Sequence, residues 1–394
     1  MSVLNVKSET DLSGFYIVYK GSVCNEKKGI FGISHLSEHL ICHSFDDMYD
    51  DFDRDGIANN AYTSDNEIVF YFTGLDEYLV KYKDEILRRI LKFSITEEMF
   101  QNERKIVLEE MKDYFNKQNY NHSLNLTRKL FNNFGPIGLR EDLENLTLKD
   151  VEEYFDLQFS KPHMIINVSK HSDFECDIEF CNKVFKDVAV LGEYETYYPG
   201  EEHSEEAVEL EPYSSRNGKT SIIVMSKVIE DDFAYVDFIT DMLGSGLRSP
   251  LYQEIREKKG LAYYVRSGLD RMTNNSATVQ ITSETSDDNV DEFLICVKDI
   301  LSNPDKYMTQ ERFDICKQAI EIQKRKQEIN RYNNVNKFIT PKEWQIENYL
   351  EDLTLDKVMK IYNKYFSYDN FIESVDTIDF PSVVKSKINK TVTE

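Results

Sequence analysis

Long apolar runs are missing from this sequence of 394 residues. No stretch approaches the ~18 consecutive apolar residues that a helix needs to span a bilayer. The first residues also lack a basic region followed by an apolar core, and they carry acids that a transit peptide would lack. We therefore expect a soluble, cytoplasmic protein with no membrane partner.

Paired cysteines are missing as well. The six cysteines are scattered along the chain, and no two of them form a C-x-x-C pair. In a chain of this length, such scatter excludes a disulfide framework and a cysteine zinc cluster. It fits a reducing compartment.

Basic charge is scarce: 47 Lys and Arg face 71 Asp and Glu, for a net charge of −24. Nucleic-acid binders need clustered basic residues against phosphates, so we expect no nucleic-acid partner. The acidity favours basic partners, or it is only a solvated surface that keeps the protein soluble. Apolar content of 41% and aromatic content of 12% are enough to bury the cores of two domains of about 200 residues each.

The most informative stretch is residues 31–41, FGISHLSEHLI. On a helix, His35 and His39 stand one above the other, with Glu38 beside them. Zn²⁺ binds imidazole readily, and His-x-x-Glu-His is the inverted metalloprotease motif in which the glutamate is the general base. A pair of histidines on a half-buried helix is the alternative.

A second helix is predicted from Thr96, a plausible N-cap, to residue 111. Glu103 and Glu110 are seven residues apart, so they share one face. A carboxylate there could be the third zinc ligand, or both could belong to a solvated acidic face.

Other elements follow from composition and periodicity. We expect an acidic connector over 45–53 and a hairpin of strands over 60–64 and 67–72. The remaining predictions are strands at 14–19, 164–168 and 220–225, and helices over 76–93, 126–134, 147–155 and 233–243.

The second half of the chain echoes the first. Residues 353–358, LTLDKV, resemble 146–151, LTLKDV, and residues 309–313 resemble 96–100. The echo indicates two copies of one α+β unit. We place an N-terminal domain at 1–195, a linker at 196–215 and a C-terminal domain at 216–394, with Cys316 and Gln323 in the places of Glu103 and Glu110.

Residues 244–265 form a second candidate motif. A glycine-rich loop is followed by a charged helix, and Gly260 is expected to end that helix. A phosphate loop is excluded because G-x-x-x-x-G-K-[ST] is missing. Without further context, Arg256 would be predicted to take part in a surface ion pair, and Tyr263 to be an aromatic residue of the core.

Four blocks together carry a family resemblance: residues 35–39, 60–64, 103–110 and 244–265. Their order resembles that of the pitrilysin/insulinase-type zinc peptidases, the inverzincins, and the chain is similar in size to subunits of the mitochondrial processing peptidase. The resemblance implies two homologous ferredoxin-like α/β domains in tandem, each a sheet covered by helices, which together form half of a clam-shell chamber. It implies a zinc-dependent endopeptidase that cuts extended or unfolded peptides.

The resemblance also implies the roles of single residues. His35, His39 and Glu110 would bind one Zn²⁺ per chain, Glu38 would be the general base, and Glu103 a supporting acid. Arg256 and Tyr263 would reach the substrate or the tetrahedral intermediate, and the edge-strand residues Asn60, Ala61 and Tyr62 would pair with the peptide.

The implied chamber needs four such domains, and the chain supplies two. A homodimer is expected because the zinc motif and the Arg256/Tyr263 motif lie in one chain, and a heterodimer is the alternative. The substrate would be a peptide, with basic peptides favoured by the acidic charge. The competing function is a non-catalytic peptide-binding or scaffold subunit, which would have no reason to keep Glu38 as a general base. A metal-binding regulator is a third possibility, and it would not need Glu38 either.

Overall fold

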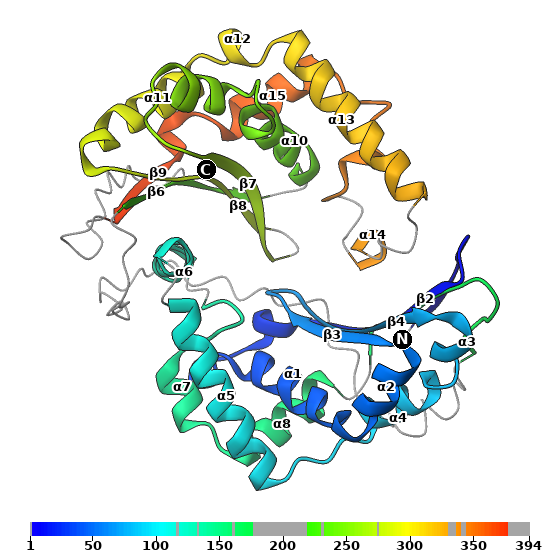
Figure 1. Cartoon of the computed structure of the whole chain (residues 1–394). Coiled ribbons are helices and arrows are strands. Elements are labelled where there is room, and N and C mark those ends of the chain that lie inside the picture. The colour runs from blue at the N-terminus through cyan, green and yellow to red at the C-terminus, as the bar shows by residue number, and fades with distance from the viewer. Residues whose placement is uncertain are drawn as a thin grey trace. The chain divides into compact units, whose positions relative to one another are not determined.

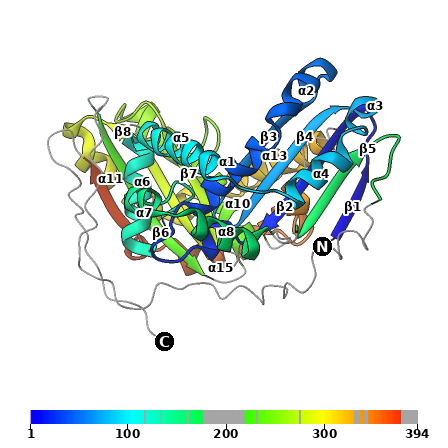
Figure 2. The ribbon, with the colours of Figure 1, turned by 90° about the horizontal axis from the view of Figure 1, so that it is seen from below.

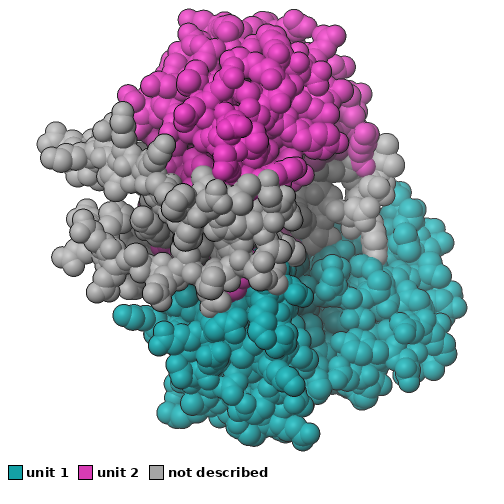
Figure 3. Space-filling view, turned by 60° about the vertical axis from the view of Figure 1, so that its left-hand side comes forward, with its two compact units in different colours: residues 1–114, 130–206, 330–335 teal, residues 115–129, 207–329, 336–394 magenta. Residues whose placement is uncertain are grey.

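The structure is a computed structural model, and it describes residues 2–115, 118–131, 134–159, 162–175, 219–229, 232–273, 276–329, 336–339 and 344–376. These residues form two compact units, coloured separately in Figure 3. The first unit contains residues 1–114, 130–206 and 330–335. The second unit contains residues 115–129, 207–329 and 336–394. The predicted linker at 196–215 lies outside the described residues, so the domain boundaries stay predictions.

The first unit is built on a five-stranded sheet in the order β1-β5-β2-β4-β3. Its strands are β1 (Ser2–Lys7), β2 (Leu12–Lys20), β3 (Ala58–Thr63), β4 (Glu67–Leu75) and β5 (Met164–Ser169). All neighbours are antiparallel except β1 and β5. Aromatic and β-branched side chains such as Phe15, Ile17 and Tyr19 are fully buried, which explains why β2 lies at the centre of the sheet.

Helices of the first unit lie along one face of this sheet (Figures 1 and 2). They are α1 (Ile33–His43), α2 (Tyr49–Asp55), α3 (Asp76–Leu79), α4 (Lys83–Leu91), α5 (Glu97–Phe115), α7 (Arg140–Asn145) and α8 (Leu148–Gln158). The predicted acidic connector is wrong, because residues 49–55 form α2. Phe52 is fully buried there, and Gly56 ends the helix at a φ of 66°.

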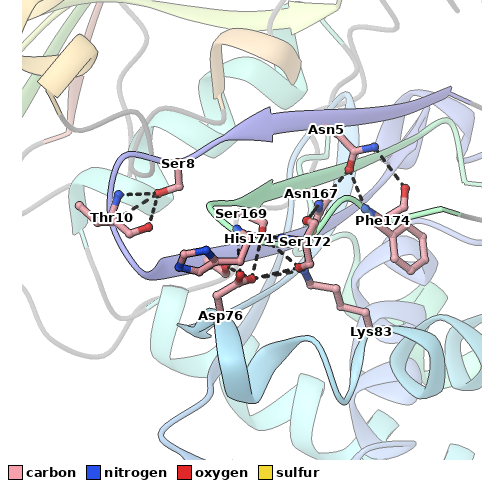
Figure 4. Close-up of polar contacts among 11 residues, drawn as sticks. Asn5, Ser8, Thr10, Asp76, Lys83, Asn167, Ser169, His171, Ser172 and Phe174 are labelled. Atoms are coloured by element: carbon pink, nitrogen blue, oxygen red, sulfur yellow. Dashed lines mark hydrogen bonds and ion pairs between the residues drawn. The ribbon is translucent and has the colours of Figure 1, made fainter.

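A buried polar network ties α3 and α4 to the sheet (Figure 4). The Asp76 carboxylate accepts hydrogen bonds from the hydroxyls of Ser13 at 2.6 Å and Ser169 at 2.7 Å. Lys83 donates to Asn167 Oδ1 at 2.7 Å, and burial lowers the pKa of its ammonium group. Each charge therefore has polar partners in the interior, as a buried ion requires.

The second unit has a four-stranded sheet in the order β7-β8-β6-β9. Its strands are β6 (Thr220–Ile229), β7 (Val265–Thr273), β8 (Ser276–Thr285) and β9 (Ile372–Asp376). Its longer helices are α10 (Phe233–Gly244), α11 (Val290–Ser302), α13 (Gln310–Ile329) and α15 (Leu355–Tyr365). None of the helices in the described ranges is long and apolar enough to cross a bilayer.

The internal repeat is confirmed by sheet order and by helix capping. The order β9-β6-β8-β7 matches β5-β2-β4-β3, strand for strand along the chain. Thr96 and Thr309 cap α5 and α13 through the backbone N–H groups three residues on, and Thr147 and Thr354 cap α8 and α15 in the same way. The chain therefore contains two homologous α+β units in tandem, as predicted.

One helix departs from the simple order. Most of α6 (Gln118–Phe131) belongs to the second unit, although it precedes the strand that completes the first. The His122 ring contacts Ser221 Oγ at 2.9 Å on β6 and Ser374 Oγ at 2.7 Å on β9. In Figure 1, α6 lies on the face of this sheet opposite α10 and α15.

Candidate metal centre

The start of α1 is held by two carboxylates. Glu26 accepts hydrogen bonds from the backbone N–H groups of Gly32 and Ser34, each at 2.9 Å. Asp142 accepts one from the N–H of Phe31 at 3.0 Å. The first N–H groups of a helix have no partner within the helix, and negative charge is favourable at this end. These contacts set the direction in which α1 leaves the loop, and with it the place of its histidines.

The two histidines of α1 lie side by side on one face. The rings of His35 and His39 are 4.8 Å apart between centroids, and 12% and 21% of their side chains are exposed. Burial, with a smaller effect from His39, lowers the pKa of His35 to about 3. His35 is therefore a neutral imidazole at neutral pH, which is the form that binds a metal ion.

Glu110 on α5 completes a group of three donors. Its Oε2 atom lies 3.4 Å from Nε2 of His39 and 3.8 Å from Nε2 of His35. One ligand atom from each residue lies within 4.8 Å of the others. Two tetrahedral zinc ligands at ordinary bond lengths are about 3.4 Å apart, so the three donors fit this geometry with only small shifts.

Glu103, one of the predicted site residues, lies behind His39. Its Oε2 atom is 3.4 Å from Nδ1 of His39, while the other ring nitrogen faces Glu110. Burial by itself would lower the pKa of His39, but the hydrogen bond to Glu103 and the nearby carboxylate charges raise it. A carboxylate on the second ring nitrogen is the usual partner of a zinc-bound histidine, because it fixes the tautomer and the ring plane.

Glu38 is buried beside the three donors, and it is bound by a residue of the neighbouring strand. The Thr63 hydroxyl on β3 donates to Glu38 Oε2 at 2.6 Å. Burial raises the pKa of Glu38, with the Glu110 charge in the same direction, although the Thr63 bond lowers it. A carboxylate whose pKa is raised above its usual range is a stronger base and is better suited to take and return a proton.

The predicted peptide-binding residues Asn60, Ala61 and Tyr62 lie on β3, at the edge of the first unit's sheet. Their strand pairs with β4 on one side, with Ala61 opposite Phe70. An edge strand can pair with an extended chain on its other side, and in this structure the Ala61 N–H donates to the side-chain oxygen of Asn60 at 2.8 Å.

Arg256 and Tyr263 contact each other in the second unit. The guanidinium carbon of Arg256 lies 4.7 Å from the Tyr263 ring centre, and Tyr263 is 74% exposed. A core position for Tyr263, the simpler reading of the sequence, is therefore wrong. The helical stretch that carries Arg256, Tyr252–Lys258, is π-helical and is followed by Gly260 at a φ of 62°.

Several residues of the site were missed by sequence reasoning. Thr63 stands in one of the blocks that carry the resemblance, but the alternation of a strand does not say which helix its face meets. His43 lies four residues beyond His39, a spacing that marks the same helix face. No local pattern marks Glu26 or Asp142 as part of the site. Asp142 binds the backbone of a segment far from it in sequence, and Glu26 binds backbone N–H groups on the other side of a loop.

Two family models match the chain. Residues 5–135, which include the donors and Glu38, match the model described as Insulinase (Peptidase family M16). Residues 145–320 match the model described as Peptidase M16 inactive domain.

Relatives in sequence are named zinc proteases. An uncharacterised zinc protease of Bacillus subtilis is 26% identical over 265 residues, which cover 62% of this chain and 61% of the relative. A zinc protease of Helicobacter pylori is 25% identical over 280 residues, covering 65% and 61%. The chain thus spans about three fifths of the length of these two relatives. An uncharacterised zinc protease of Rickettsia felis is 22% identical over 85% of both chains.

Solved structures share the fold. A protease from Helicobacter pylori superposes with a TM-score of 0.75 at 18% identity, covering 95% of this chain and 96% of the other. A peptidase M16 inactive domain from Pseudomonas fluorescens gives 0.73 at 16% identity, with coverage of 98% and 97%. With the paired family models and the zinc-protease relatives, this shared fold shows that the chain belongs to the pitrilysin/insulinase-type, or M16, peptidase family.

Proposed function

We propose that the protein is a zinc-dependent endopeptidase that cuts extended or unfolded peptides. The observation that carries the proposal is the convergence of His35, His39 and Glu110, with buried Glu38 beside them. These three residues would hold one Zn²⁺ per chain. When bound, the ion would supply Lewis acidity, polarising the scissile carbonyl and making water more acidic.

The chain's own residues carry the proton and orient the substrate. Glu38 takes the proton of the attacking water and returns it to the leaving amine, while Thr63 holds its carboxylate in place. Glu103 holds the His39 ring. The β3 edge pairs with the peptide backbone, so the substrate must be extended there.

Arg256 and Tyr263 act on the substrate or the oxyanion, each as a hydrogen-bond donor. Because these two residues and the metal ligands belong to one chain, a homodimer has two equivalent sites, and a heterodimer is the alternative. The net charge of −24 favours basic peptides over acidic ones.

The second candidate function is a non-catalytic peptide-binding subunit, which the match to the inactive-domain model favours. That match covers residues 145–320, where Cys316 stands in the place of Glu103. The donors and Glu38 lie within the other match, so the peptidase is the better-supported function.

Replacement of Glu38 by glutamine tests the proposal. We expect Glu38→Gln to keep about one zinc per chain and to lose about 10²- to 10⁴-fold in kcat/KM, because it cannot accept the proton. Unstructured basic and acidic peptides serve as substrates, zinc is measured on the same samples, and sedimentation equilibrium gives their mass.

Glu109→Gln is the matched control, because Glu109 lies on α5 but is exposed and pairs with Lys112. It should cut as well as wild type. Wild-type protein that binds zinc and peptide but cuts nothing would favour the non-catalytic subunit. A fully active monomer would contradict the dimer.

A further inference from the structure

His43, the last residue of α1, lies on the same face as the two histidines of the candidate metal centre. Its Nδ1 atom is 3.4 Å from Oε1 of Glu103 and 3.0 Å from Oδ2 of Asp46. The other oxygen of Glu103, Oε2, is the one that contacts Nδ1 of His39. One carboxylate therefore lies between two imidazole rings, and each of its oxygens faces a different ring.

The direction of these contacts follows from their chemistry. Nδ1 of His43 faces two carboxylate oxygens, which only accept hydrogen bonds, so the proton of the ring must be on Nδ1. That single N–H lies between Asp46 at 3.0 Å and Glu103 at 3.4 Å, so the two carboxylates share it and together fix the His43 ring. The Asp46 side chain is half exposed and that of Glu103 is 10% exposed, so the contact with Glu103 is the more protected of the two.

A second donor matters to Glu103 because the torsion that turns a glutamate carboxylate is soft. A carboxylate held only by His39 could rotate and leave that ring with a poorly aligned acceptor. With His43 Nδ1 at 3.4 Å from its other oxygen, the carboxylate has a cationic or donor group on each side, which restricts this rotation. A fixed acceptor holds the His39 ring in the orientation in which Nε2 points toward Glu110.

We infer that His43, oriented by Asp46, is a positioning residue that fixes the Glu103 carboxylate behind His39 and so tightens metal binding by His35, His39 and Glu110. The inference rests on the proposed function, because it takes these three residues to be the ligands. The ion-pair contacts that the described residues give His43 are with Asp46 and Glu103, so it acts on the ligands through Glu103.

Two substitutions in the full chain test the inference. In His43→Asn the amide N–H₂ is the same number of bonds from the backbone as Nδ1 and can donate to Glu103, whereas His43→Ala has no donor. We expect His43→Ala to weaken zinc binding about 10- to 100-fold in a chelator competition, the usual effect of removing an outer-layer partner. His43→Asn should stay within about threefold of wild type. In the cleavage assay, His43→Ala should lower kcat with KM unchanged.

A double-mutant cycle identifies the route of the effect. If His43 acts through Glu103, His43→Ala should have little further effect on zinc affinity in a Glu103→Ala background, which has no acceptor for His43. His171→Ala is the matched control, because His171 is an exposed histidine of the same unit that also pairs with an aspartate. It should leave zinc affinity unchanged.

The results separate this inference from the proposed function. The wild-type zinc affinity and the loss of zinc in His35→Ala test the ligand site. The zinc affinity of His43→Ala relative to that of His43→Asn tests the role of His43, whether or not peptide is cut. Unchanged zinc affinity in His43→Ala, no rescue by asparagine, or additive effects with Glu103→Ala would each overturn the inference. A second zinc ion that is lost in His43→Ala would also overturn it, because His43 would then be a ligand.

Discussion

At the scale of single residues, Thr63 links the edge strand β3 to Glu38, the proposed general base. Its hydroxyl donates to Glu38 at 2.6 Å, so the strand proposed to bind peptide also orients the group proposed to move the proton. A hydrogen bond to a charged group contributes about 1.5 to 3 kcal/mol. Thr63 is therefore a residue whose loss should affect the chemical step more than metal binding.

Replacement of Thr63 by valine keeps the shape of the side chain and removes the hydroxyl. We expect Thr63→Val to lower kcat about tenfold or more, with zinc content unchanged, because Glu38 loses its orienting donor. Steady-state kinetics with zinc analysis measures both quantities. Thr63→Ser keeps the hydroxyl and should stay near wild type; equal kcat in the valine and wild-type proteins would contradict the role.

At the scale of elements, the site depends on where α1 begins. Gly32 has a φ of 98°, and a Cβ atom on Gly138 would lie 2.4 Å from the Gly32 Cα atom. The close approach of the two glycines lets the loop before α1 pack tightly. Glu26 then binds the first N–H groups of the helix from a buried position, where burial raises its pKa to about 7.

Replacement of Glu26 by glutamine should loosen this helix start. One accepting oxygen becomes an N–H₂ group that faces a backbone N–H, so a buried donor loses its partner at a cost of about 1 to 3 kcal/mol. We expect faster hydrogen exchange at the amides of residues 32–36 and weaker zinc binding. Glu153→Gln, at an exposed ion pair on α8, is the control, and exchange rates equal to those of the control would refute the prediction.

At the scale of the whole molecule, a buried histidine makes the stability of the second unit depend on pH. His122 anchors α6 to the second unit's sheet with both ring nitrogens bound, and burial lowers its pKa to about 4 from an ordinary value of 6.5. The unfolded chain therefore binds this proton at a higher pH than the folded unit does. Stability from neutral His122 is complete above about pH 6.5 and is lost as the pH falls from there toward 4, by up to about 3 kcal/mol.

The single tryptophan makes this loss measurable. Trp344 stacks on Phe233 with 3.9 Å between ring centres, so its fluorescence reports unfolding of the second unit. We expect the urea midpoint at pH 5, relative to pH 7, to fall more in wild type than in His122→Asn, which cannot titrate there. Asp237, whose pKa burial raises to about 7, acts in the opposite direction, so the comparison is between variants. His171→Asn should behave like wild type, and identical pH dependence in the His122 variant would refute the prediction.

Local patterns were enough to predict most elements. The apolar and aromatic alternation predicted β2, and Thr96 was predicted as the cap of α5 because a hydroxyl binds the N–H three residues on. The prediction over residues 45–53 was wrong because its many acids suggested a solvated connector. In the structure Phe52 and Met48 are buried, and that packing makes the segment helical.

The sequence by itself determined that His35, Glu38 and His39 share one helix face, that the chain repeats one unit, and which family it resembles. These properties depend on residue spacing along the chain, which is set by helix and strand geometry. Only the tertiary structure decided that Glu110 approaches these histidines, that Thr63 meets Glu38, that Glu103 lies between His39 and His43, and that α6 packs on the second unit. Periodicity says which residues of an element share a face, but the partner of that face is chosen by packing between segments far apart in sequence.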